Sequence, residues 1–294
     1  MNLPAMMRLI EPLLQHDGYS ETALPSVTVF GSHKHIKRTP MVYQPSLIFV
    51  AQGRKIGYLG DREIHYNPGH YLVQTLPLPF ECETFASEQA PLMGVSVRID
   101  PATLAELVHA TDAPAVTVQA SPEPMASVTM TDAMEEAVMR LLRALADSQT
   151  AQLMGPSRER EVIFEALSGA QGPALRALVD GSGNYSRVVQ ALELMHTDIA
   201  ADLSVEQLAE QAHMSVSSFH QHFKEVTQSS PLQYIKRLRL LKAQMLLSRD
   251  DLNVTQTAEL VGYRSVNQFS RDYKRYFLVS PLQDKRDALQ RVAS

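Results

Sequence analysis

The pattern of hydrophobic and polar positions divides the chain into a strand-rich first part and a helical remainder. Between about residues 26 and 98, short β-branched or aromatic runs alternate with turn signals such as Gln52-Gly53 and Asn67-Pro68-Gly69. We expect strands over 27–30, 46–50, 55–58, 63–66, 71–73 and 93–97. Many short strands at regular spacing are typical of an antiparallel sandwich or barrel.

From Pro101 onward the apolar spacing lengthens to that of a helix. The pattern predicts helices over 102–110, 131–148 and 157–168. The second of these helices carries an apolar stripe made of Met134, Val138, Leu141 and Leu145. That stripe must be covered, either by the chain's own barrel or by a second copy of the chain. A turn-rich linker at 180–184 then divides the chain into two expected domains, 1–180 and 181–294.

A repeat of about 50 residues marks the second of these domains. Ser215-Val216-Ser217-Ser218-Phe219 returns as Ser265-Val266-Asn267-Gln268-Phe269, and Ser230-Pro231-Leu232-Gln233 returns as Ser280-Pro281-Leu282-Gln283. Each copy also holds polar residues suited to starting helices. These are Ser204, Gln207 and Ser215 in the first copy and Asn253, Gln256 and Ser265 in the second. The sequence therefore predicts two helix-turn-helix units, at about 204–226 and 253–276.

The second helix of each unit presents an outer face of polar or small side chains. These are Ser217, His220 and Gln221 in the first unit, and Val266, Asn267, Ser270 and Arg271 in the second. Such residues suit the edges of bases: Arg pairs with guanine, Asn or Gln with adenine, and Val meets the thymine methyl group. A helix from Ser230-Pro231 to about Leu247 joins the units and spans about 25 Å. That length is comparable to the ~34 Å between successive major-groove segments.

The charge distribution changes the meaning of the net charge of −5. Residues 1–181 carry 13 Lys and Arg against 20 Asp and Glu, whereas residues 182–294 carry 14 against 12. Between residues 224 and 286 there are 12 basic and 6 acidic residues. A basic second domain is compatible with DNA binding. The candidates for phosphate contact are Lys224, Lys236, Arg237, Arg239, Lys274 and Arg275.

The composition excludes several classes of protein. No apolar run approaches the ~20 residues that cross a bilayer, and residues 1–15 do not resemble a signal peptide. The single cysteine, Cys82, rules out an internal disulfide framework and fits a reducing compartment. We therefore expect a cytoplasmic protein.

The second domain resembles the AraC/XylS-type transcription regulators. The resemblance rests on Ala258-Glu259-Leu260-Val261-Gly262-Tyr263, on Phe269-Ser270-Arg271, on Tyr276-Phe277 and on Ser280-Pro281, and it covers about residues 185–290. It implies that two recognition helices enter adjacent major grooves, with the outer-face residues of both helices near bases. Small side chains at Ser217 and Ser218 depart from the larger ones often seen, so shape and phosphate contacts would contribute more in the first helix.

The first domain is similar to the cupin-like N-terminal domain of one branch of that family. The similarity rests on segments 43–47, 50–55 and 67–73, and it implies a small β-barrel that binds an effector, with helices available for dimerisation. Candidate effector contacts are Arg54, Lys55, His70 and Cys82. Cys82 is either a redox or electrophile sensor or a small semi-buried residue, and its neighbours Glu81 and Glu83 would raise the pKa of its thiol.

The fold class that follows is α+β, with an antiparallel barrel, flanking helices and an all-α domain of two helix-turn-helix units. The expected function is sequence-specific transcription regulation, with no enzyme activity and no cofactor. The expected partners are double-stranded promoter DNA, an unidentified small molecule, RNA polymerase and a second copy of the chain. One alternative is a cupin-type metalloenzyme that uses His33, His35, His65 and His70. Another is a helical protein-interaction module.

Overall fold

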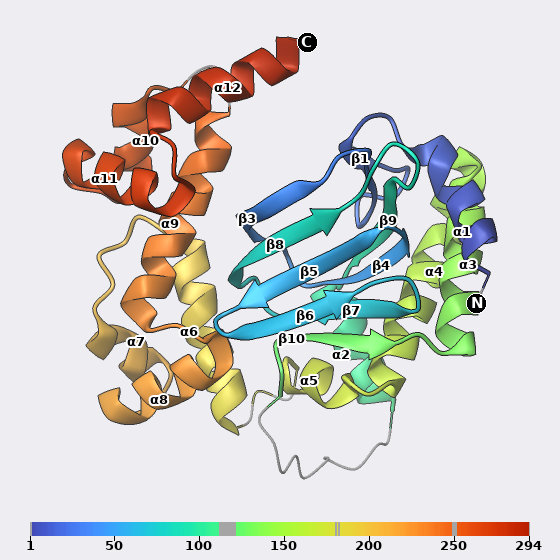
Figure 1. Ribbon diagram of the computed structural model, residues 1–294. Helices are drawn as coiled ribbons and strands as arrows, with labels where there is room; N and C mark the ends of the chain where they lie inside the picture. The colour runs from blue at the N-terminus through green and yellow to red at the C-terminus, as the bar shows by residue number, and fades with distance from the viewer. Residues whose placement is uncertain (1, 112–121, 180, 182, 249–251, 294) are drawn as a thin grey trace. The chain divides into compact units, whose positions relative to one another are not determined.

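The protein is described by a computed structural model that covers residues 2–111, 122–179, 181, 183–248 and 252–293 (Figure 1). Two compact units are present. The first consists of Met1–Arg38, Tyr43–Pro77 and Glu81–Ser186, and the second of Thr39–Val42, Leu78–Phe80 and Arg187–Ser294. The expected linker at 180–184 includes Asp180 and Ser182, which lie outside the described residues.

The strands form two β-sheets that follow the expected antiparallel pattern. The strands are β1 (Gly18–Glu21), β2 (Val27–Ser32), β3 (Ile36–Val42), β4 (Ser46–Gln52), β5 (Arg54–Leu59), β6 (Arg62–Tyr66), β7 (His70–Gln74), β8 (Pro79–Phe85), β9 (Leu92–Arg98) and β10 (Met125–Thr129). Apart from the end of β3 and the start of β8, these strands belong to the first unit. One sheet has the order β1-β2-β9-β4-β7-β10, and the other has the order β3-β8-β5-β6. Every pair whose register is described is antiparallel. The α+β fold class is confirmed.

All six strands expected from the sequence are present, but β1, β3, β8 and β10 are additional. β3 was missed because its sequence, Ile36–Val42, contains Lys37, Arg38 and Pro40 and its first residues are exposed. β8 alternates buried and half-buried positions, but Glu81 and Glu83 occupy its outward positions and obscure the pattern. Both strands depend on pairing within the sheet more than on apolar content.

The core of the first unit lies between the six-stranded sheet and three helices. These are α1 (Leu3–Ile10), α3 (Asp132–Leu145) and α4 (Ser148–Ser168), which lie close together in Figure 1. Val29, Phe49 and Val95 from the sheet join Met134 and Leu141 from α3 in one buried cluster. Because side chains alternate across a strand, the residues next to Val29 on β2 and next to Phe49 on β4 face the other sheet.

The apolar stripe of α3 is covered within its own unit. Met134, Val138, Leu141 and Leu145 are all at most 4% exposed and belong to the buried cluster. Of the two alternatives for this stripe, the structure supports packing within the chain rather than contact with a second copy.

Two helix boundaries expected from the sequence were wrong. The helix expected over 131–148 ends at Leu145, and α4 starts at Ser148, nine residues before the expected start at 157. Asp147 caps α4 by accepting a hydrogen bond from the Thr150 N–H at 2.7 Å, and Pro156 lies inside the helix. A proline is common in the first turn of a helix, so the sequence favours a later start than the one the structure has.

The remaining helices complete the two units. In the first, η1 (Glu11–Leu13) is a single 3₁₀ turn, and α2 (Pro101–Ala110) and α5 (Gly172–Ala177) are short helices. The second is helical from α6 onward: α6 (Gly183–Thr197), α7 (Val205–Gln211), α8 (Val216–Thr227), α9 (Pro231–Leu247), α10 (Val254–Leu260), α11 (Val266–Phe277) and α12 (Pro281–Ala293). Among the described residues, no helix combines the length and the apolar character that crossing a bilayer requires.

Gly94 on β9 gives a test of this packing. Its partner in the register is Phe30, and a Cβ built at Gly94 would lie 2.2 Å from the Phe30 ring and 2.5 Å from the carbonyl oxygen of Phe49. We expect Gly94→Ala to lower the free energy of unfolding by about 1–3 kcal/mol, as overpacked cores do. Urea denaturation measures this change. Ala102→Ser, which adds one atom at an exposed position, is the control, and an equal loss in both variants would contradict the prediction.

Candidate nucleic-acid interface

The first helix-turn-helix unit is built from α7 and α8. Ser204 accepts a hydrogen bond from the Gln207 N–H at 3.2 Å, and the Gln207 side chain accepts one from the Ser204 N–H at 2.9 Å, which completes the expected capping box. Ser215 caps α8 by accepting a hydrogen bond from the Ser218 N–H. Phe219 on α8 is fully buried.

The second unit, built from α10 and α11, repeats this geometry. Asn253 and Gln256 form the same reciprocal pair at 2.9 and 3.0 Å, and Ser265 caps α11 through the Gln268 N–H. Phe269 and Tyr273 are fully buried. Both capping boxes and both recognition-helix caps therefore lie where the sequence predicts them.

The turns of the two units differ by one residue. The Met214 N–H donates to Ala209 and the Tyr263 N–H donates to Ala258, each at 2.9 Å, so these positions correspond at an offset of 49. The helix caps Ser215 and Ser265 are 50 residues apart. The additional residue in the second turn is Arg264, whose guanidinium pairs with Asp202 at 2.5 Å. The repeat interval is therefore 49 residues before Arg264 and 50 residues after it.

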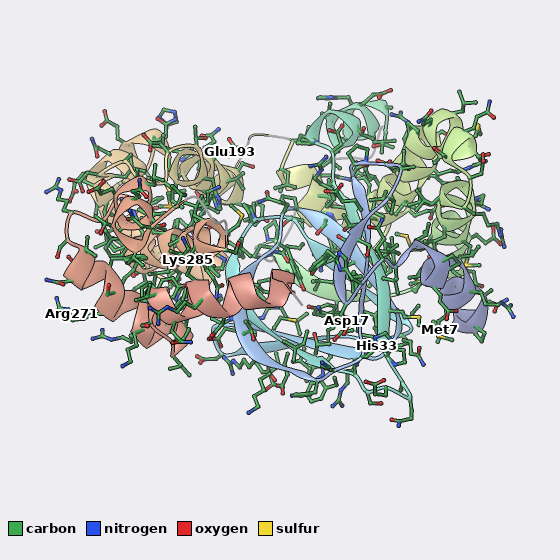
Figure 2. All side chains as sticks on the ribbon, turned by 90° about the horizontal axis from the view of Figure 1, so that it is seen from above. Met7, Asp17, His33, Glu193, Arg271 and Lys285 are labelled. Carbon is green, nitrogen blue, oxygen red and sulfur yellow. The ribbon has the colours of Figure 1, made fainter. Side chains whose placement is uncertain are left out.

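The outer face of each recognition helix is accessible to a ligand. Ser217, His220, Gln221, Asn267 and Arg271 are exposed, and Val266 and Ser270 are half-buried. Arg271 lies at the outer edge of the helical unit (Figure 2). The base-reading role of these residues stays a prediction, but each of them lies on the accessible side of its helix.

The two recognition helices differ in charge. α8 carries Lys224 and Glu225, which cancel, and Glu225 accepts hydrogen bonds from Gln221 and His222 that hold the pKa of its carboxyl below its usual value. At the positions equivalent to Gln221 and Glu225, α11 carries Arg271 and Arg275. The second helix is therefore the more attractive of the two to a phosphate backbone.

Two of the expected phosphate contacts are engaged inside the protein. Lys236 forms an ion pair with buried Asp272 of α11, with Nζ 2.8 Å from Oδ1. The Arg239 guanidinium donates to the carbonyl oxygens of Ile199 at 2.8 Å, Ala201 at 2.8 Å and Gly262 at 3.2 Å. Both cations therefore already have partners within the protein, while 34% of the Lys236 side chain stays exposed. Lys224, Lys274 and Arg275 are exposed and Arg237 is half-buried.

The structure separates the four candidate effector contacts into two pairs. Lys55 and Cys82 are buried, at 5% and 1% exposure, and the register places Lys55 opposite Tyr66 on the face of the sheet that points to the interior. Arg54 lies outside, 4.1 Å from the centre of the Phe85 ring, and His70 is exposed. The carboxylates that neighbour Cys82 in the sequence lie on the opposite face of β8, so they are not directed at the thiol as the sequence suggested.

Aromatic residues surround the buried pair. Lys55 Nζ lies 5.3 Å from the centre of the Phe30 ring and 5.9 Å from that of Tyr43. The Tyr66 hydroxyl forms a hydrogen bond with Cys82 Sγ at 3.1 Å. Burial raises the pKa of the Tyr43 and Tyr66 hydroxyls well above the ordinary value of 10.0, so both stay protonated. The sequence offered no signal for this cluster because its members come from separate strands and a loop.

The four histidines weighed as metal ligands do not converge. His33 pairs with Asp17, His35 with Glu83 and His65 with Glu63, and His70 is exposed on β7. Within the part of the chain that the structure describes, no group of three or more His, Cys, Asp or Glu residues is arranged to hold a metal ion. His33 and His35 both lie in the connection between β2 and β3 rather than on a strand.

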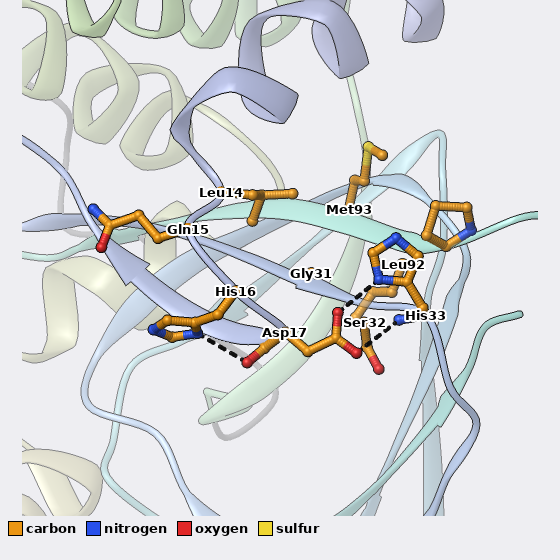
Figure 3. Close-up of a pocket in the computed structure, with 10 residues that line it drawn as sticks. Leu14, Gln15, His16, Asp17, Gly31, Ser32, His33, Leu92 and Met93 are labelled. Atoms are coloured by element: carbon orange, nitrogen blue, oxygen red, sulfur yellow. Dashed lines mark hydrogen bonds and ion pairs between the residues drawn. The ribbon is translucent and has the colours of Figure 1, made fainter. Parts of the chain in front are cut away.

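A small pocket lies beside β2, where the segment before β1 crosses it (Figure 3). Asp17 accepts hydrogen bonds from His33 Nδ1 at 2.7 Å and from the His33 N–H at 3.2 Å, and the side-chain bond is the main reason that the pKa of Asp17 is lowered. Leu14, Leu92 and Met93 supply the apolar wall. The volume of about 210 Å³ is below the ~300–1,000 Å³ typical of ligand sites.

Two paired helix-turn-helix units, each with an exposed polar helix, are typical of DNA-binding transcription regulators. Comparison with known proteins supports the same class of protein. Residues 23–174 match the family described as "AraC-type transcriptional regulator N-terminus", and residues 208–287 match a helix-turn-helix domain. The chain belongs to the AraC family of transcription regulators. The resemblance noted in the sequence is therefore confirmed.

Individual relatives agree with this assignment. The chain is 34% identical over 133 residues to the transcriptional activator RhaS of Citrobacter koseri, covering 44% of this chain and 47% of that protein. It is 33% identical over 152 residues to RhaS of Salmonella schwarzengrund, covering 51% and 53%. The match thus spans about half the length of these curated relatives.

Solved structures extend the comparison to the whole fold. ToxT from Vibrio cholerae, in a structure described as bound to an unsaturated fatty acid, aligns with a TM-score of 0.60 at 11% identity, covering 88% of this chain and 94% of ToxT. An apo variant of ToxT gives a TM-score of 0.59 at 10% identity, covering 92% of this chain and 98% of that one. At these identities the likeness establishes the fold alone.

The turn of the first unit gives a test of local strain. His213 has a φ of 51°, in the left-handed region, and the equivalent residue of the second unit is Gly262 with a φ of 81°. Because that conformation disfavours a residue with a Cβ, we expect His213→Gly to raise the free energy of unfolding by up to about 1 kcal/mol. His220→Gly inside α8 should lower it by about 1 kcal/mol. Thermal and urea unfolding measure both changes in the free energy of unfolding. A lower free energy of unfolding in both variants would contradict the proposed backbone strain at His213.

Proposed function

We propose that this protein is a sequence-specific DNA-binding transcription regulator whose two recognition helices read adjacent major-groove segments, and whose first unit binds a small molecule. The observation that carries the proposal is the pair of matched helix-turn-helix units packed on one helix, α9. Each unit leaves a polar helix face exposed. No catalytic role is proposed for any residue.

The differences between the units favour unequal contributions to binding. α11 presents Asn267 and Arg271, side chains that can form two hydrogen bonds with one base. α8 presents Ser217, His220 and Gln221, and the Gln221 amide already donates to Glu225 at 3.0 Å. We infer that α11 supplies most of the direct base recognition and that α8 contributes more through backbone contacts and DNA shape.

Selection from random duplex DNA with the purified full chain is the direct test. A binding regulator enriches a defined site, and its affinity for that site falls steeply as salt rises, because bound phosphates release counterions. A protein-interaction module would enrich no site and show no such salt dependence. A metalloenzyme would instead hold a stoichiometric metal ion, which elemental analysis of the same preparation detects.

RNA polymerase is a further partner that we propose for such a regulator. A second copy of the chain is another, since two associated chains would contact twice the length of DNA. Because the α3 stripe is buried within the unit, we propose that dimerisation uses another surface. Sedimentation velocity with and without the selected DNA tests this arrangement.

Arg271 is the sharpest test of base recognition. If its guanidinium forms two hydrogen bonds with a guanine, Arg271→Ala weakens binding to the selected site by about 1–3 kcal/mol and relaxes the preference at one base pair. Lys274→Ala, which removes an exposed cation from the same helix, should weaken binding to all sequences alike and reduce the salt slope by about 1. Gel-shift titrations against single-base variants measure both. An unchanged base preference in Arg271→Ala would contradict the proposed recognition of a guanine by Arg271.

For the effector, we propose that Lys55 binds an anionic group inside the first unit. A buried ammonium is costly unless an opposite charge or hydrogen-bond acceptors accompany it. The contacts described for Lys55 are the two aromatic rings, and the carboxylates of the neighbouring strands, Glu63, Glu81 and Glu83, pair on the opposite face. An anionic ligand would supply the missing charge. The fatty acid in the ToxT structure is also a carboxylic acid.

The matched variants are Lys55→Gln and Arg54→Gln, because Arg54 is the adjacent cation on the outer face. We expect benzoate or oleate to raise the Tm of the wild-type chain and of Arg54→Gln but not that of Lys55→Gln, since a ligand stabilises only the state that binds it. Benzyl and oleyl alcohols are the neutral controls. An equal response in Lys55→Gln, or no response of the wild type to any carboxylate, would contradict this assignment.

A further inference from the structure

The second unit contains a junction that connects its two helix-turn-helix units directly, in addition to α9. Residues Ile199 to Asp202 lead into α7 of the first unit, and Val261 to Arg264 form the turn of the second. These two segments are about 60 residues apart in the sequence, yet they lie in contact. Arg239, the ninth of the 17 residues of α9, lies between them.

The Arg239 side chain holds both segments at once. Its Nε donates to the Ile199 carbonyl and one terminal nitrogen donates to the Ala201 carbonyl, both at 2.8 Å. The other terminal nitrogen donates to the Gly262 carbonyl at 3.2 Å. A guanidinium has five N–H groups in a fixed plane on three nitrogens, so it can reach three separated carbonyls with defined geometry, whereas the three donors of a lysine ammonium share one nitrogen.

Two further contacts close the same junction. Gly262 has a φ of 81°, and a Cβ built there would lie 2.7 Å from the Ala200 carbonyl oxygen and 2.8 Å from Ala200 Cα. Glycine is therefore required both by the backbone conformation and by the close approach of the other segment. The inserted residue of the second turn, Arg264, reaches across to Asp202.

We propose that Arg239 is a positioning residue that fixes the separation and rotation of the two recognition helices, so that the protein accepts only one spacing between its two DNA half-elements. Without this junction, the two units are connected through α9 and the packing of each unit on it. A small rotation at one end of α9 would displace the other recognition helix along the groove. The inference rests on the proposed DNA-binding function, but the junction itself can be tested without DNA.

A distance measurement tests the junction directly. Cys82 is the only cysteine and is buried, so Cys82→Ser gives a background for spin labels on two exposed helix positions, introduced by Ser217→Cys and Asn267→Cys. Pulsed electron paramagnetic resonance then reports the distance between α8 and α11. We expect a narrow distribution in the parent, a broadened or shifted one in Arg239→Gln and Arg239→Lys, and no change in Lys242→Gln, which removes an exposed cation from the same helix.

A second variant opens the same junction from its other side. Gly262→Ala leaves Arg239 intact but places a methyl group against Ala200, and it should broaden the distribution in the same way. Circular dichroism and Tm identify any variant that fails to fold. A distribution as narrow as that of the parent in folded Arg239→Gln and Gly262→Ala would overturn the proposal.

Binding to spaced sites tests the consequence for recognition. Duplexes carrying the selected site are compared with duplexes in which one or two base pairs are inserted between its two half-elements. The wild type should bind the altered duplexes at least tenfold more weakly, and Arg239→Gln should lose most of that discrimination while keeping its preference within each half-element. Equal discrimination in the variant would refute the positioning role. Failure of the wild type to select any site would instead refute the proposed function and leave the distance measurement to decide.

Discussion

Helix α9 is the element on which the second unit depends, because both helix-turn-helix units complete their cores on it. A seven-residue helix such as α7 or α10 is too short to be stable alone in water. Toward its start, α9 contributes Tyr234, whose ring meets Phe223 of α8 edge-on at 5.5 Å. Toward its end, Leu240 and Leu247 join Phe269 and Tyr273 of α11 in one buried cluster. One helix therefore contributes to the cores of both units.

Two of the basic residues of α9 differ from those of the recognition helices. Lys236 and Arg239 use their charge within the protein, the first on Asp272 and the second on backbone carbonyls. Basic residues on α8 and α11 stay exposed. Part of the positive charge of this region is thus used within the protein, so the number of Lys and Arg residues is larger than the number of cations without such a role.

In the first unit, side chains alternate between the two faces of each sheet, and the two faces have different environments. The face of the six-stranded sheet that lies against α1, α3 and α4 carries buried apolar residues. On the other sheet, Lys55, Tyr66 and Cys82 turn inward while Arg54 and the glutamates turn outward. The interior thus combines aromatic rings with a buried cation, and the proposal of an anionic ligand rests on this combination.

The sequence by itself determined the features that depend on local patterns. These include the two capping boxes, the proline-started α9, the strands β2, β4, β5, β6, β7 and β9, and the exposed faces of α8 and α11, because caps and periodicity act within a few residues. Tertiary structure decided whatever depends on residues far apart in the chain. Arg239 resembles a surface cation until Ala201 and Gly262 are seen beside it, and Lys55 resembles Arg54 until the strand register assigns them opposite faces. A side chain's partner is set by long-range packing, which no local pattern encodes.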